Sequence, residues 1–159
     1  ILTALDYGAS RVNAFDINPK VHHAVEGPFR ELSGGPYSLP GVTAKIGEAR
    51  SQIRGTGPYD VVELPMTDTY SASSSGTLVF SENGLYTVEA FRLFMSELKP
   101  GGVLSVSRFF SPTMPGETTR ILATARDALP HDSTSPPSAF QIRMKTSAPG
   151  DLPGSSPII

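Results

Sequence analysis

The 159-residue sequence contains no cysteine, so disulfides, thiolate catalysis and thiolate zinc sites are all excluded. The absence of cysteine also fits a reducing compartment. An excess of basic residues is missing as well, because the formal net charge is -2. Proteins that bind the phosphate backbone of nucleic acids usually carry such an excess. We therefore expect no nucleic-acid partner.

Long apolar runs are also absent. No stretch approaches the roughly 18–20 apolar residues of a membrane span, and the first residues lack a charged segment followed by an apolar one. We expect a soluble, cytoplasmic segment without direct membrane contact. The chain starts with Ile1, and its first residues already have the pattern of an amphipathic helix. We expect that the chain begins inside an element of a longer protein.

Two catalytic motifs of defined spacing are missing. The sequence has neither a GxSxG turn for a serine nucleophile nor a GxxxxGK loop for nucleotide phosphates. The histidines, His22, His23 and His131, show no pairing with an acid and a nucleophile. Most histidines on a helix surface are solvated or packed, so we expect no metal site. The sequence gives no support to a hydrolase triad or to binding of nucleoside triphosphates.

The sequence does contain an alternation of strand-like and helix-like segments. Short apolar or alternating runs predict strands at residues 12–16, 42–46, 59–64 and 103–107. Apolar residues at helical spacing predict helices after Pro19, over 85–98 and over 116–129. Strands that alternate with helices favour parallel βαβ units with right-handed crossovers. The predicted architecture is an open α/β sheet.

Local signals limit two of these helices. The helix after Pro19 is expected to kink or stop early at Gly27-Pro28. Four apolar residues along it would form a stripe that faces a sheet: Val21, Val25, Phe29 and Leu32. The helix over 85–98 has an N-cap candidate in Ser81, and the segment 100–102, Pro-Gly-Gly, would end it.

The composition divides the chain into two parts. Residues 1–129 carry the strand and helix patterns and predict one domain. Residues 130–159 are rich in Pro, Ser and Gly, and only residues 139–144 have the pattern of a strand. We expect this C-terminal tail to be poorly ordered.

The stretch RVNAFDINPKV, residues 11–21, combines a strand, an acid and a helix start. Asp16 ends the predicted strand, Asn18 is a favoured N-cap, and Pro19 suits the first helical position. In α/β nucleotide-binding sheets an acid at this place accepts hydrogen bonds from ribose hydroxyls. The competing interpretation is that Asp16 merely helps to cap the helix. This stretch alone leaves the two interpretations near even.

Further acids follow the next predicted strands. Glu48 comes after the second strand and Gly47, Glu63 lies near the end of the third strand, and Asp68 follows a few residues later. Parallel sheets bind ligands just beyond the carboxyl ends of their strands, so these acids and Asp16 could face one crevice. Chance is the competing explanation, because Asp and Glu are common in loops.

The order of several segments resembles a known family. The segments are RVNAFDINPKV, KIGEARSQIR, YDVVE, TDTYSASSSGTLVF and LYTVEAFRLFMSELKPGGVLSVS. Together they resemble the spermidine synthase-like branch of the class I S-adenosylmethionine-dependent transferases, over roughly residues 1–129. The resemblance implies a Rossmann-like, class I methyltransferase-like fold. It also implies that the Gly-rich first strand of the family lies upstream of Ile1.

The resemblance assigns roles to the strand-end residues. Asp16 corresponds to the acid that holds the ribose, and Ile17 to the apolar residue that packs on the adenine. Gly47 and Glu48 correspond to the pair that contacts the adenine amino group, with Ala49 next. Thr67-Asp68 best matches the pair that contains the catalytic acid, which makes Asp68 the base.

Two departures from the family pattern affect the acceptor site. The aminopropyltransferases have a second Asp followed by Pro three residues after the catalytic acid, whereas Ser71 and Ala72 stand here. The segment between the third strand and Asp68 is also longer than usual. Either Glu63 or Asp68 could therefore face the sulfonium.

The reaction implied by the resemblance is transfer of an alkyl group from a sulfonium to a small-molecule amine. The donor would be S-adenosylmethionine or decarboxylated S-adenosylmethionine, and no metal is needed. Aminopropyl transfer gives a polyamine, and a methyltransferase acting on another acceptor is an alternative. A non-catalytic remnant that binds a nucleoside is a third. A homodimer and attachment to membrane-spanning segments elsewhere in a longer protein both stay open.

Overall fold

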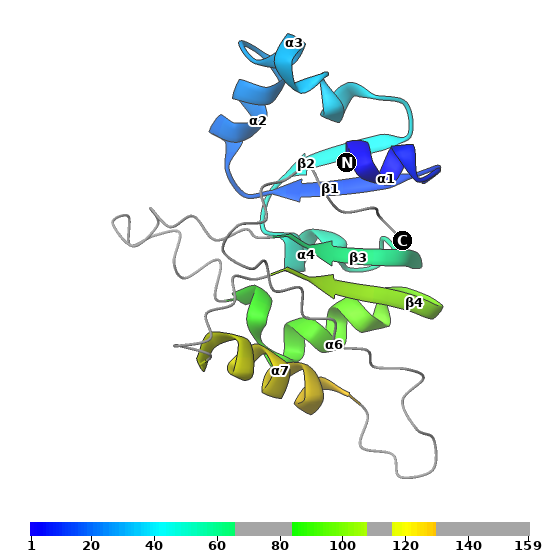
Figure 1. Ribbon diagram of the computed structural model, residues 1–159, viewed down its shortest axis with the longest axis vertical. Helices are drawn as coiled ribbons and strands as arrows, with labels where there is room; N and C mark the ends of the chain where they lie inside the picture. The colour runs from blue at the N-terminus through cyan, green and yellow to red at the C-terminus, as the bar shows by residue number, and fades with distance from the viewer. Residues whose placement is uncertain (66–83, 108–115, 130–159) are drawn as a thin grey trace, which may run out of the picture.

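The computed structural model describes residues 1–65, 84–107 and 116–129 (Figure 1). The described elements alternate between helices and strands along the chain. In order they are α1 (Leu2–Asp6), β1 (Val12–Asp16), α2 (Pro19–Glu26), α3 (Arg30–Ser33), η1 (Pro36–Ser38), β2 (Val42–Ile46), α4 (Ala49–Ile53), β3 (Tyr59–Leu64), η3 (Gly84–Tyr86), α6 (Val88–Ser96), β4 (Leu98–Val106) and α7 (Gly116–Ala128). The protein is thus a mixed α/β structure, as predicted. The tail 130–159, with the strand predicted at 139–144, lies outside the described residues.

The described strands form two parallel pairs. β1 pairs with β2 in a register that runs from Val12 opposite Val42 to Asp16 opposite Ile46. β3 pairs with β4, with Leu64 opposite Val106 at the end. All four arrows point to the same side of the molecule in Figure 1. The predicted strands and their parallel pairing are confirmed, but hydrogen-bonded ladders join the described strands only within each pair.

Side chains connect the two pairs. The Asn13 side chain in β1 donates a hydrogen bond to the Tyr59 hydroxyl in β3. Phe15 of β1 packs against the buried cluster that contains Val62 and Leu64 of β3. In Figure 1 the β1–β2 pair lies above the β3–β4 pair, with β1 and β3 as the inner strands. The contact between the pairs is therefore made by side chains of their inner strands.

The core lies on one face of the β3–β4 pair. Alternation along β3 buries Val62 and Leu64, and α4 and α6 cover them. The first buried cluster contains Ile53, Val62, Leu64, Ala90 and Phe94. The second joins α6 to α7 and contains Phe91, Ile121, Ala125 and Ala128. On the opposite face, Val61 and its ladder partner Val103 are each more than half exposed. Strands of a parallel sheet are usually buried on both faces, whereas β3 and β4 are buried on one face only.

The helix after β1 is shorter than its apolar pattern. α2 begins with the Asn18 side chain accepting from the Lys20 N–H at 2.9 Å, and it ends at Glu26, directly before Gly27-Pro28. The predicted early stop is confirmed. The predicted apolar stripe is wrong, because Phe29 and Leu32, beyond the stop, are 56% and 87% exposed.

The helix before β4 is shorter than the predicted range 85–98. α6 covers Val88–Ser96, and the Thr87 side chain caps it by accepting from the Ala90 N–H at 3.2 Å. Leu98, predicted to lie in the helix, starts β4. The backbone oxygen of Glu97 accepts from the Tyr59 N–H at 2.8 Å, which brings the chain alongside β3 directly after the helix. The segment 100–102 therefore lies inside β4, at an irregularity of the ladder, and does not end the helix.

The last described helix agrees with its pattern. α7 (Gly116–Ala128) ends one residue before the predicted boundary and packs on α6 through Ile121 and Ala125. Within the described residues, no helix has the length and apolar character that crossing a membrane requires.

Candidate functional site

Asp16 lies at the carboxyl end of β1 and is half-buried. One carboxylate oxygen, Oδ1, accepts the backbone N–H of Asn18 at 2.7 Å. No hydrogen bond to a described residue engages the other oxygen. Asn18, not Asp16, caps α2. Asp16 therefore shapes the turn before the helix and keeps one oxygen available to a ligand.

The strand pairing brings the segment after β2 next to Asp16. The Gly47 N–H donates to the backbone oxygen of Asp16 at 2.9 Å. Gly47 has a φ of 154°, and a Cβ built there would lie 2.8 Å from the Gln52 side-chain nitrogen. A side chain at position 47 would thus be both strained and crowded. Ile17, directly after Asp16, is 38% exposed and leaves an apolar surface at the same end of the strands.

Glu48 is the N-cap residue of α4. Its carboxylate accepts the N–H groups of Arg50 and Ser51 and the Ser51 hydroxyl, each at 2.8 Å. Ala49 follows as the first residue of the helix and is half-buried. Both carboxylate oxygens of Glu48 thus satisfy the start of α4. The sequence assigned Glu48 to a ligand and did not reveal this capping role.

The remaining predicted acids belong to the other strand pair or follow it. Glu63 is the penultimate residue of β3, pairs in register with Ser105, and has an exposed side chain. It makes no hydrogen bond or ion pair with a described residue. Asp68, the predicted base, lies outside the described residues, as do Thr67 and Ser71. The structure thus brings Asp16 and the Gly47-Glu48 segment together, while no described contact links Glu63 to Asp16.

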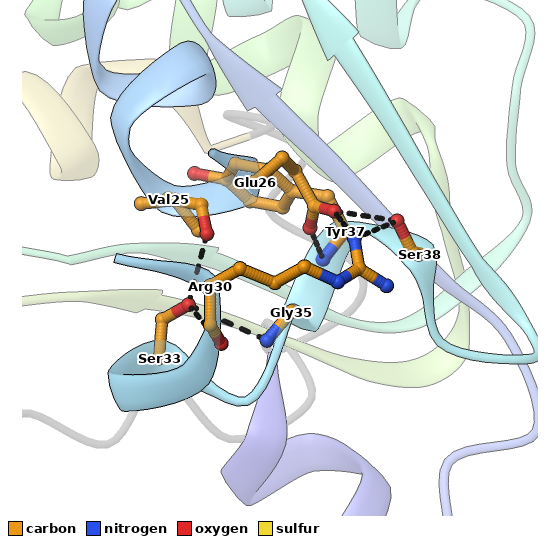
Figure 2. A network of polar contacts seen from close by, with 7 residues as sticks. All are labelled: Val25, Glu26, Arg30, Ser33, Gly35, Tyr37 and Ser38. Carbon is orange, nitrogen blue, oxygen red and sulfur yellow. Dashed lines mark hydrogen bonds and ion pairs between the residues drawn. The ribbon is translucent and has the colours of Figure 1, made fainter. Parts of the chain in front are cut away.

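A polar network connects α2 with η1 (Figure 2). The Glu26 carboxylate accepts the Tyr37 N–H at 2.9 Å, the Ser38 hydroxyl at 2.5 Å and an Arg30 guanidinium N–H. Arg30 also donates to the Ser38 hydroxyl oxygen at 3.2 Å. Glu26 ends α2 and Arg30 begins α3, so this ion pair joins the two helices across the turn between them. Together these contacts fix η1 against the end of α2.

The network positions an aromatic ring that the sequence did not single out. The Tyr37 ring stacks on the His22 imidazole of α2, with centroids 4.7 Å apart and planes 19° from parallel. In Figure 2 the Tyr37 ring passes beside Glu26. Gly34 and Gly35 both adopt the left-handed backbone conformation, and the chain returns from them to the end of α2. His22 is a packed histidine, as most histidines on helices are.

The surroundings in this network raise the pKa of Tyr37 and lower the pKa of Glu26. Burial raises the pKa of the Tyr37 phenol, and the charges of Asp16 and Glu26 raise it further. The hydrogen bond from Ser38 is the main cause that lowers the pKa of Glu26, aided by the Tyr37 N–H and Arg30. Near neutral pH, the Tyr37 side chain is therefore a neutral phenol.

The part of the chain that the structure describes contains no group of three or more His, Asp or Glu side chains arranged to hold a metal ion. A scan against protein-family models found no model that matches the chain. The function must therefore be argued from the residues of the site itself.

Proposed function

We propose that this chain is part of a spermidine synthase-like transferase domain that binds an S-adenosylmethionine-type nucleoside, with Asp16 as the ribose acid. The observation that carries the proposal is the position of Asp16 at the carboxyl end of a parallel strand with one carboxylate oxygen available. Such an oxygen accepts a hydrogen bond from a sugar hydroxyl without losing an existing partner.

The surroundings of Asp16 support this use. The backbone bond from Gly47 holds the end of β2 beside Asp16, and the φ of 154° at position 47 favours glycine there. Ile17 offers apolar area on which an adenine ring can pack. A nucleoside needs both a polar partner for its sugar and an apolar surface for its base.

The finer architecture belongs to the same proposal. We infer that the two parallel pairs are parts of one Rossmann-like open sheet of the class I methyltransferase type. The common direction of the four strands supports this (Figure 1). The contacts of Asn13 with Tyr59 and of Phe15 with the β3 core support it as well. In such a sheet all strand-end acids share one edge.

The reaction we propose is in-line transfer of an aminopropyl group from the sulfonium of decarboxylated S-adenosylmethionine to an amine. The C–S bond breaks as the amine nitrogen forms a bond to the same carbon, the electron pair stays on sulfur, and the amine proton passes to a carboxylate. Asp68 is our candidate for that carboxylate, and Glu63 is the second. Holding the two reactants in line supplies much of the acceleration, and the carboxylate acts as a general base.

A second candidate is a nucleoside-binding module without turnover. The observation that favours it is that both carboxylate oxygens of Glu48 accept hydrogen bonds from the first turn of α4. A contact between Glu48 and the adenine amino group would have to compete with these bonds. A domain that lost catalysis but kept the ribose acid would have this arrangement.

Isothermal titration calorimetry combined with product analysis tests the proposal. The full chain is titrated with decarboxylated S-adenosylmethionine, S-adenosylmethionine and methylthioadenosine. It is then incubated with each donor and a set of amines, and mass spectrometry measures the masses of the products. We expect binding of the nucleosides and an aminopropyl mass increase on an amine. A methyl increase would favour a methyltransferase, and binding without any product would favour the non-catalytic module. Folded protein that binds none of the three would contradict the proposal.

A further inference from the structure

Two half-buried residues near the start of α2, Asp16 and Tyr37, each carry a side-chain oxygen with no hydrogen-bond partner among the described residues. One is the second carboxylate oxygen of Asp16, because only Oδ1 meets the Asn18 N–H. The other is the Tyr37 hydroxyl, because the Tyr37 bond in the Glu26 network uses the backbone N–H. A ligand with two neighbouring hydroxyls would supply a partner both to the carboxylate acceptor and to the phenol donor.

Several contacts hold the Tyr37 ring in a fixed place. Its backbone is bound to Glu26, and one face of its ring lies on His22 at 4.7 Å. Ser38, the next residue, is bound to Glu26 and Arg30 (Figure 2). A ring that is fixed from its backbone and from one face loses little conformational freedom when its hydroxyl binds a ligand.

The position of His22 relates this ring to Asp16. Asp16 binds the N–H of Asn18, the residue that caps α2, and His22 lies one turn into the same helix. The ring stacked on His22 thus lies beside the helix turn that follows the acid. The charge of Asp16 also contributes to the raised pKa of the phenol, which stays protonated and can donate near neutral pH.

We propose that the Tyr37 hydroxyl and the unpaired oxygen of Asp16 together bind the two adjacent hydroxyls of a ribose, and that His22 is a positioning residue for Tyr37. This inference rests on the proposed nucleoside function and adds a specificity: the site selects a sugar that carries both the 2′ and the 3′ hydroxyl. The carboxylate accepts from one hydroxyl, and the phenol exchanges a hydrogen bond with the other.

The test measures affinities of the full chain for adenosine, 2′-deoxyadenosine and 3′-deoxyadenosine by calorimetry. The variant is Tyr37→Phe, which keeps the ring and its stack. The matched control is Tyr7→Phe, because Tyr7 is 72% exposed. We expect Tyr37→Phe to weaken adenosine binding about fivefold, the loss expected for one neutral hydrogen bond. One deoxy nucleoside, the one that lacks the partner of Tyr37, should bind the variant and the wild type equally.

The positioning role of His22 has its own test. His22→Ala removes the stacked ring and should weaken adenosine binding, whereas His22→Phe restores an aromatic ring and should recover most of the affinity. Equal loss in the two variants would contradict a role through stacking. Thermal unfolding of each variant verifies that the fold is retained.

The outcomes separate the two proposals. If the wild type binds adenosine but Tyr37→Phe binds all three nucleosides as the wild type does, the inference on Tyr37 fails and the proposed function stands. Equal weakening of all three nucleosides also overturns the inference, because it indicates a general structural effect. If the folded wild type binds none of them, the inference on Tyr37 is wrong, and the titration with the two S-adenosylmethionine donors and methylthioadenosine decides the proposed function separately.

Discussion

The Asn13 side-chain amide in β1 donates a hydrogen bond to the Tyr59 hydroxyl in β3. That hydroxyl donates in turn to Thr56 Oγ1 at 2.6 Å, and the Arg11 guanidinium lies 5.6 Å from the centroid of the Tyr59 ring. Arg11 and Asn13 belong to the segment of the β1–β2 pair, whereas Tyr59 begins β3. Tyr59 therefore stabilises the contact between the two strand pairs.

We expect Tyr59→Phe to lower the free energy of unfolding by about 1–2 kcal/mol, because it leaves the half-buried Asn13 amide and Thr56 hydroxyl without their shared partner. Urea unfolding measures the change. Tyr7→Phe is the control, and its effect should stay within about 0.5 kcal/mol because Tyr7 is largely exposed. Equal effects of the two substitutions would show that the Tyr59 hydroxyl contributes nothing to the connection.

Phe94 is the largest side chain that is fully buried among the described residues, at 2% exposure. It packs from α6 onto the buried face of β3. We expect Phe94→Ala to cost about 3–5 kcal/mol, the usual loss for a large aromatic residue in a core. Leu32→Ala is the control at a highly exposed position and should be nearly neutral. Urea unfolding compares the two variants, and a loss below about 1 kcal/mol for Phe94→Ala would argue against the described packing of α6.

The Glu97 carboxylate accepts the backbone N–H groups of Gly55 at 2.6 Å and Gly57 at 2.9 Å. The bond to Gly55 and then the bond to Gly57 are the largest causes that lower the pKa of Glu97 in the folded protein. The unfolded chain lacks these bonds. Glu97 therefore stabilises the fold fully above the ordinary glutamate pKa, and this contribution is lost as the pH falls through the lowered folded-state pKa.

We expect Glu97→Gln to cost about 1 kcal/mol near neutral pH, after allowance for solvent screening of a partly exposed group. The difference from the wild type should shrink as the pH falls through the acid range. Urea unfolding at a series of pH values measures it. The control is Glu31→Gln, which removes the same charge from an exposed side chain that makes no hydrogen bond to a described backbone N–H. A Glu97→Gln difference that is constant with pH would contradict the account.

The sequence predicted the four strands well because their signal is local. Gly47 follows the run of β2 and Pro65 follows that of β3, and the observed bounds of β1, β2 and β3 match the predicted ranges. β4 starts earlier than predicted because Leu98 pairs with Tyr59, a contact between distant parts of the chain. A helix pattern that continues into Leu98 cannot reveal that pairing.

The candidate site was predicted in part for the same reason. Asp16 could be found from a strand, an acid and a helix cap that are adjacent in sequence. The capping bonds of Glu48 were missed because Glu is not among the preferred N-cap residues. Tyr37 was missed because its partners Glu26 and His22 are distant in sequence, and only folding brings them to η1.

The central claim is that Asp16 holds the ribose of a nucleoside, and the affinity of Asp16→Asn for methylthioadenosine tests it most directly. The amide keeps an oxygen for the Asn18 N–H but removes the charge that the sugar hydroxyl meets. We predict weaker binding by about 1.5–3 kcal/mol, the value for hydrogen bonds to a charged group, with no change for the exposed control Asp6→Asn. An affinity of Asp16→Asn equal to that of the wild type would contradict the claim and leave Asp16 with a structural role in the turn before α2.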